Sequence, residues 1–235
     1  MPRQGGGRRK PKSAGDVKKP GSRSKRSVAS NGILKSRRSH SHAERILNFW
    51  LTPDTDAHDL VNSWSRWFDP NPDLDRLCKT LFLSSYRDAA CGRLDGWKKT
   101  PRTCLALVLL LDQFPRNMFR GTAKAFATDA KAREISRHAI ASGFDRELGR
   151  IMRMFLYLPL EHSEHLNDQM ESVRLASALA EDYGTSPAGA AIRDSAEFHL
   201  KTILHFGRFP GRNEALGRLS TKEEIEFLKQ PNEAP

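Results

Sequence analysis

The chain has 235 residues, enough to bury a sizeable hydrophobic core, and a formal net charge of +11. Residues 1–40 carry 13 Lys and Arg against one acidic residue, whereas the remaining residues carry 26 basic and 27 acidic side chains. This distribution excludes a generally basic nucleic-acid-binding domain after residue 40, so any such binding is expected to depend on the first 40 residues.

The three cysteines are widely spaced and form no C-x-x-C pair, which argues against a disulfide framework or a zinc ribbon. No apolar run approaches the ~20 residues that span a bilayer. The N-terminus lacks the apolar region of a secretory signal. We therefore expect a soluble cytoplasmic protein with no membrane partner, and leave open import into a nucleus or an organelle through the basic residues near the N-terminus.

Residues 1–40 consist mostly of Gly, Ser, Lys, Arg and Pro, and this composition predicts a disordered basic tail. The tail is either a solubilising extension or a tether to an anionic surface, with weak, non-specific nucleic-acid binding through residues 1–40. The ordered part is expected to be one domain over residues 41–235.

Apolar residues at helical spacing predict helices in the first half of that domain. One long helix should present an apolar face that includes Leu77 and Leu81, and a later helix is apolar nearly all round, which predicts a central position. The expected helices are 43–51, a short one carrying 60–68, 73–91 and the central 102–114.

In the second half, a helix is expected to stop at Pro159, and Ser220-Thr221-Lys222-Glu223 resembles a capping box. The expected helices are 128–142, 145–157, 161–182, 187–205 and a short last one through Leu228. No alternating apolar pattern predicts a strand. The predicted class is all-α, a single domain of antiparallel helix pairs.

A motif of Phe-Pro followed by arginine and asparagine occurs twice, at Phe114 to Asn117 and at Phe209 to Asn213. We call these segments the first and second corners. Because proline removes a backbone donor, the central helix should end or kink near Phe114. Guanidinium and amide groups bind carboxylates and phosphates, so the predicted ligand-binding residues are Asp112, Arg116, Asn117, Arg120, Arg208, Arg212 and Asn213. The alternative is that they cap helix carbonyls and pair with nearby acids.

A second polar cluster is Glu161-His162-Ser163-Glu164-His165, expected in the first turn of a helix, where acids favour the helix dipole. His162, His199 and Glu164 are the candidate catalytic residues, since imidazole titrates near neutrality and a glutamate can orient it. Glu161 and Gln169 complete the predicted ligand-binding set. No H-E-x-x-H motif is present, so neither a metal nor a cofactor is expected.

Several motifs resemble a largely bacterial family, domain of unknown function 924. They include Ile46 to Trp50, Leu105 to Asn117, Ala125 to Asp129, Glu161 to Glu164 and Phe206 to Pro210, over about residues 43–228. The resemblance implies an all-helical fold similar to tetratricopeptide-repeat proteins, and it brings no established reaction, substrate or cofactor. The chain has Gly211 where family members usually have His, and His165 where they usually have an acid. If the missing histidine serves a family reaction, this member is expected to be impaired or altered.

We therefore expect a helical-repeat-like module that binds a small anionic ligand or peptide through the paired corners. One alternative is a hydrolase or transferase that uses His162 or His199 as acid–base and the arginines as electrostatic stabilisers. Another is a nucleic-acid-associated protein acting through its tail. An enzyme should bring histidines and arginines together with a perturbed histidine pKa, whereas a scaffold should leave them dispersed at helix ends. The sequence predicts no oligomeric state.

Overall fold

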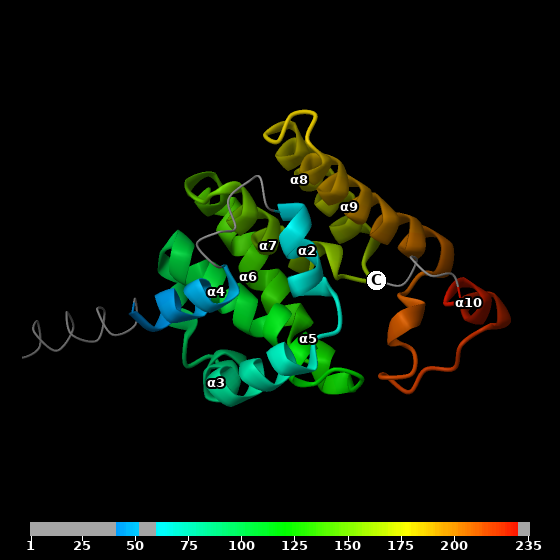
Figure 1. Ribbon diagram of the computed structural model, residues 1–235, viewed down its shortest axis with the longest axis horizontal. Coiled ribbons are helices and arrows are strands. Elements are labelled where there is room, and N and C mark those ends of the chain that lie inside the picture. The colour runs from blue at the N-terminus through cyan, green and yellow to red at the C-terminus, as the bar shows by residue number, and fades with distance from the viewer. Residues whose placement is uncertain (1–40, 52–59, 230–235) are drawn as a thin grey trace, which may run out of the picture. The chain divides into compact units, whose positions relative to one another are not determined.

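The architecture is described by a computed structural model that places residues 41–51 and 60–229. Within these ranges every regular element is a helix, which confirms the predicted all-α class (Figure 1). A helix at 41–50 comes first, followed by α2 (Leu60–Phe68), α3 (Pro72–Ala90), α4 (Pro101–Leu111), α5 (Gln113–Met118), α6 (Asp129–Ala141), α7 (Arg150–Glu161), α8 (Leu166–Glu181), α9 (Pro187–Phe206) and α10 (Lys222–Phe227). The tail predicted at 1–40 lies outside the described residues.

Helix α4 is the centre of the hydrophobic core. All of its residues from Thr103 to Leu111 are buried, and it contacts α3, α5, α6 and α7. A helix that is apolar nearly all round is stable only when other elements cover every side of it. The predicted central position of this helix is therefore confirmed.

The later helices pack against their neighbours in the chain, α6 on α7, α7 on α8 and α8 on α9, and α8 and α9 lie side by side (Figure 1). The last two approach closely at Gly189, where an added Cβ would lie 2.9 Å from the backbone oxygen of Ala180. Together the described residues form a single domain. The likeness to tetratricopeptide repeats stays a prediction.

The central helix ends close to Phe114, where an end or a kink was predicted, whereas Pro159 lies inside a helix that it was expected to stop. The central helix ends at Leu111, and Pro115 lies in the first turn of α5, where a backbone N–H would have no partner within the helix. Helix α7 starts at Arg150 and continues through Pro159 to Glu161. Its continuation buries Leu158 and Leu160, and this burial offsets the hydrogen bond that the proline lacks.

The polar cluster at 161–165 was predicted to begin a helix, and this was wrong. Glu161 is the last residue of α7, and α8 begins only at Leu166. The two histidines of the cluster therefore lie in a connection and do not share a helix face. Because the cluster follows the end of α7 and does not begin α8, His162 reaches Asp112 at the end of α4.

Two smaller predictions also need correction. Leu77 and Leu81 are 46% and 48% exposed, because the buried face of α3 is formed by Leu74, Cys78, Phe82, Ser85 and Ala89. The capping box of α10 pairs Thr221 with Glu224, one residue later than predicted. The predicted apolar face of α3 was therefore too wide, and the predicted capping box was one residue out of register.

Candidate functional site

The two corners bring their arginines to one acid, Asp129, at the start of α6. Arg116 of the first corner donates from Nη1 and Nη2 to the two oxygens of Asp129 at 2.9 and 3.0 Å. Arg212 of the second corner donates from Nη1 to Asp129 Oδ2 at 3.4 Å. The carboxylate therefore binds one guanidinium through two good hydrogen bonds and the other through a single long contact.

The charge of Arg116 is well compensated. Its Nη1 also donates to the backbone oxygen of Asp112 at 2.7 Å and lies 3.3 Å from the Asp112 carboxylate. Burial disfavours the charged guanidinium, but the two carboxylates of Asp112 and Asp129 outweigh burial and raise the pKa of Arg116 above its ordinary value. Part of its role is thus the capping that the sequence left as an alternative.

Arg212 is held in an apolar environment. Its guanidinium carbon lies 4.8 Å from the ring centroid of Phe126 and 4.5 Å from that of Phe209, and its Nη2 donates to the backbone oxygen of His162 at 2.9 Å. Burial, followed by the charge of Arg116, lowers the pKa of Arg212 to about 10. It is therefore a largely buried cation, with a side chain 12% exposed, whose charge is incompletely matched.

The first histidine of the site is oriented by Asp112, which is 1% exposed. His162 Nδ1 lies 2.8 Å from Asp112 Oδ1, and Gln113 Nε2 donates to the other oxygen at 2.6 Å. Burial would raise the pKa of Asp112, but Arg116 and His162 hold it well below its usual range. Because an ionised carboxylate only accepts hydrogen bonds, Nδ1 of His162 donates to Asp112 and Nε2 is left for another partner.

The second histidine is oriented in the same way from α9. His199 Nδ1 lies 2.9 Å from the backbone oxygen of Ser195 and 3.2 Å from Glu161 Oε1, and both of these groups accept. The Ser195 hydroxyl donates to the same oxygen of Glu161 at 2.7 Å. Nδ1 of His199 is thus protonated and Nε2 is the acceptor. Burial lowers the pKa of His199, although Glu161 opposes this shift.

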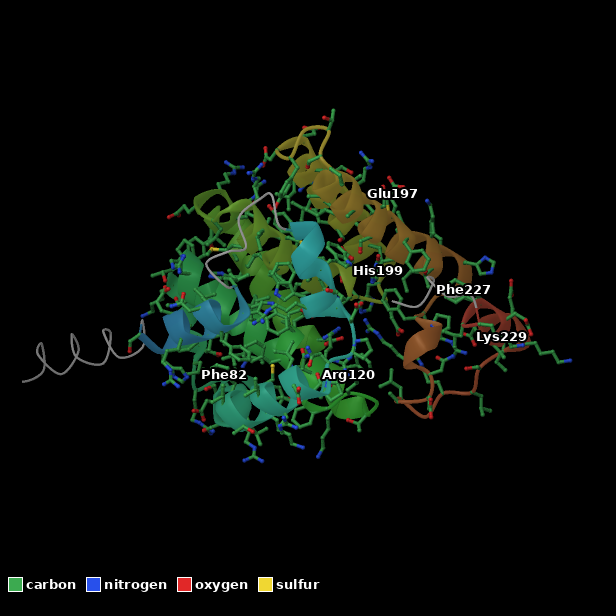
Figure 2. All side chains as sticks on the ribbon, in the orientation of Figure 1. Phe82, Arg120, Glu197, His199, Phe227 and Lys229 are labelled. Carbon is green, nitrogen blue, oxygen red and sulfur yellow. The ribbon has the colours of Figure 1, made fainter. Side chains whose placement is uncertain are left out.

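The two imidazole rings lie near each other, with centroids 6.3 Å apart, and His199 also contacts the ring of Phe209 at 5.5 Å. His199 lies on the side of α9 that faces the other helices, whereas Glu197 lies on its outer side (Figure 2). Among the described residues neither Nε2 has a hydrogen-bond partner. The same cluster holds three carboxylates, from Asp112, Asp129 and Glu161, and the two guanidinium groups of Arg116 and Arg212.

We call this cluster the Arg–His site; it contains six of the residues predicted from sequence: Asp112, Arg116, Glu161, His162, His199 and Arg212. The structure places the others elsewhere. Asn117 and Arg120 both donate to Asp75 of α3, so Arg120 does not join the two site arginines. Arg208 and Asn213 bind Glu224 of α10. These four side chains fasten helices together.

Two further predicted residues support the site from outside. Glu164 pairs with Arg218 and accepts from the backbone N–H of Phe209 at 2.8 Å, so it fixes the second corner and orients neither histidine. The side-chain amide of Gln169 donates to the backbone oxygens of Glu161 and Ser163 at 2.5 and 2.6 Å. It thereby holds the connection between α7 and α8.

Sequence reasoning missed four residues of the site: Phe126, Asp129, Ser195 and Phe209. Asp129 was interpreted only as a helix start, and no spacing rule relates it to arginines 13 and 83 residues away. The only signal was that Phe126 and Asp129 belong to a motif of the family resemblance. Within the described residues, no group of three or more His, Cys, Asp or Glu can hold a metal ion, and no helix is long and apolar enough to cross a membrane.

Comparison with known proteins identifies relatives but no reaction. Residues 46–232 match the family described as "Bacterial protein of unknown function (DUF924)". The solved structure of a protein of unknown function from Agrobacterium tumefaciens is 36% identical, with a TM-score of 0.69, and the match covers 82% of this chain and 99% of that one. No curated protein matches this chain.

Proposed function

This chain belongs to the DUF924 family of bacterial proteins of unknown function, and we propose that it binds a small anionic molecule at Arg212 and exchanges a proton with it through His162 or His199. The observation that carries the proposal is the placement of two histidines with unpartnered Nε2 atoms beside a largely buried and poorly compensated arginine. The proposal joins the anion-binding module expected from the sequence with its enzyme alternative.

The anion is assigned to Arg212 because Arg116 already has its acceptors. Asp129 lies 3.4 Å from Arg212 but 2.9 and 3.0 Å from Arg116. An oxyanion beside Arg212 would supply a further acceptor and favour the charged guanidinium. The faces of Phe126 and Phe209 hold the guanidinium in place, so little side-chain freedom is lost on binding.

The histidines have the orientation that proton transfer requires. In each ring a buried acceptor holds Nδ1–H, which fixes the tautomer and leaves Nε2 for the ligand. The ionised Asp112 also stabilises the imidazolium that forms when His162 takes up a proton. Arg212 is placed to stabilise negative charge that develops on the bound molecule. Hydrolases and transferases use such an arrangement.

The arrangement favours acid–base chemistry over a purely structural role for the corners. Histidines and arginines from α5, the connection between α7 and α8, α9 and the second corner meet at one place, and burial perturbs the pKa of His199. The asparagines and Arg120, in contrast, serve only to join helices. We therefore assign anion binding to Arg212 and not to the paired corners as a whole.

A thermal-shift screen tests the binding step with phosphate, sulfate and small carboxylates on wild type, Arg212→Lys and Arg76→Lys. Arg76 forms an exposed ion pair with Asp73 and serves as the matched control. An anion at one hundred times its dissociation constant should stabilise wild type and the control by about 2.7 kcal/mol. It should stabilise Arg212→Lys less, because an ammonium cannot reproduce the guanidinium fork. If all anions act alike on the three proteins, Arg212 is not a binding site.

Metabolite profiling tests the chemical step. Purified protein is incubated with a cell extract, and mass spectrometry compares wild type with His162→Gln and with the exposed-histidine control His138→Gln. We expect at least one anionic compound to be consumed by wild type and by the control but not by His162→Gln. Equal profiles for all three proteins would mean that the site binds a ligand but does not exchange a proton with it in a reaction.

A further inference from the structure

We infer that the ligand of the Arg–His site carries an alcohol hydroxyl close to its oxyanion, as hydroxy acids and phosphate esters of polyols do. This inference rests on the proposed function and specifies the class of its ligand. It follows from which atoms of the two histidines can accept a hydrogen bond, from the carboxylates beside the two rings, and from the short span of the site.

The Nε2 atoms of the two histidines require a hydrogen-bond donor from the ligand. Nδ1 of His199 faces a backbone oxygen and a carboxylate, and Nδ1 of His162 faces both oxygens of Asp112 at 2.8 and 3.1 Å. Since these groups only accept, both Nε2 atoms present lone pairs when the rings are neutral. The side chains are each 13% exposed, so an Nε2 atom covered by a ligand without a donor would lose its hydrogen bond to water.

The carboxylates of the cluster also favour a ligand with a hydroxyl group. The carboxylates of Asp112 and Glu161 lie directly beside the rings of His162 and His199. A plain anion would therefore be attracted at Arg212 and opposed near the histidines by the lone pairs of the rings and by these two carboxylates. A ligand with a hydroxyl replaces this repulsion with a hydrogen bond from O–H to Nε2 and keeps its oxyanion on the arginine.

The cation and the acceptors lie close enough together for one small molecule. Phe209 contacts both the Arg212 guanidinium, at 4.5 Å, and the His199 ring, at 5.5 Å. The Nη2 atom of Arg212 donates to the backbone of His162 itself. A compound of a few carbon atoms can therefore place an oxyanion at Arg212 while its hydroxyl reaches an imidazole.

Two matched pairs of probes test the inference by calorimetry on the full chain: malate against succinate, and glycerol 3-phosphate against propyl phosphate. Within each pair the anionic group is kept and hydroxyls are removed. We expect the hydroxylated member of at least one pair to bind about tenfold more tightly or better to wild type. The pair that discriminates tells whether the oxyanion is a carboxylate or a phosphate.

Variants identify the groups that recognise the hydroxyl. His199→Phe and His162→Phe remove an Nε2 acceptor and keep an aromatic ring, and His138→Phe on the exposed side of α6 is the control. The tenfold preference should disappear in one of the first two variants and persist in the control. The wild-type comparison does not depend on any variant folding.

The possible outcomes separate the two proposals. Equal affinity within both pairs would overturn the hydroxyl inference and leave the anion site intact. A preference that survives in both histidine variants would also overturn it, since another group would then recognise the hydroxyl. If none of the four probes binds wild type, both this inference and the proposed function fail.

Discussion

The first corner lies in α5 and leads from the buried end of α4, whereas the second follows α9 and forms a 3-10 turn at Pro210–Arg212. Both corners send an arginine to Asp129. Arg116 forms two good hydrogen bonds there and has Asp112 beside it, while Arg212 has one long contact and two phenyl faces. The asparagines differ as well, because Asn117 binds α3 and Asn213 binds α10 and the segment before it.

This difference shows that a repeated motif does not imply a repeated role. The two arginines are distinguished by the acceptors around them and not by the neighbours in sequence. Arg116 has a raised pKa and Arg212 a lowered one, although both side chains are largely buried. We take the first to be structural and the second to be the site of ligand binding.

The largest expected effect comes from removing the acid that the corners share. Asp129→Asn leaves two largely buried guanidinium groups without their common carboxylate, and breaking such an ion pair costs up to about 3–5 kcal/mol. Urea unfolding followed by circular dichroism measures the free energy of unfolding. The control Asp73→Asn breaks only an exposed ion pair and should change it by less than about 0.5 kcal/mol. A loss below about 1 kcal/mol for Asp129→Asn would mean that the corners are not held together at this acid.

Replacing each arginine by lysine should separate the two corners. Arg116→Lys loses charged hydrogen bonds to Asp129 and to the backbone of Asp112, and should lower the free energy of unfolding by about 1.5–3 kcal/mol. Arg212→Lys should lower it less but weaken anion binding about tenfold, or about 1.4 kcal/mol. Denaturant unfolding and calorimetry measure the two effects. The opposite result, with binding lost only in Arg116→Lys, would reverse our assignment of roles.

The pH dependence of stability tests the packing of His199 against the second corner. Burial lowers the pKa of His199 below its ordinary 6.5, so the unfolded chain binds this proton more readily than the folded one. The groups around the ring are Glu161, which opposes the shift, and His162 and Arg212, which add to it. The contribution of His199 to the free energy of unfolding should therefore be complete above about pH 6.5 and should decrease as the pH falls below this value.

A single proton can contribute at most about 1.4 kcal/mol per pH unit to this slope. Unfolding free energies measured between pH 7.5 and 5 should decrease for wild type, and the slope should be smaller in His199→Phe. His138→Phe is the control and should keep the wild-type slope. An unchanged slope in His199→Phe would show that this ring does not lose its proton on folding.

The smallest effects are expected at the glycines that flank the corners. Gly121 follows the first corner with φ +75° and Gly207 precedes the second with φ +70°, and an added Cβ would meet no atom within 4 Å at either position. Alanine should therefore cost only the left-handed strain, about 1–2 kcal/mol in each case, and leave anion affinity unchanged. Gly149→Ala is the control, because its φ of −63° suits any residue and its Cβ is also free. A loss of anion affinity in Gly207→Ala alone would show that this glycine also tunes the site.

The helices themselves could be predicted from the sequence because local spacing carries their signal. The apolar run before Asp112 required a buried helix, and the long helix from Pro187 was placed within one residue of its observed end. Helix ends were less predictable. Pro159 was expected to terminate a helix, but the cost of a proline depends on its place in the helix and on the burial of its neighbours.

The sequence by itself determined the all-helical class, the central helix and the residue types of the Arg–His site, since each depends on patterns within a few turns of chain. Only the tertiary structure decided which side chains meet. Arg116 and Arg212 are 96 positions apart in the chain, and their common acceptor belongs to a third element. Arg120 follows Arg116 by four residues and has the same side chain, but it donates to Asp75 of α3. A guanidinium binds whichever carboxylate the packed helices bring within reach, and that distance is set by the whole fold.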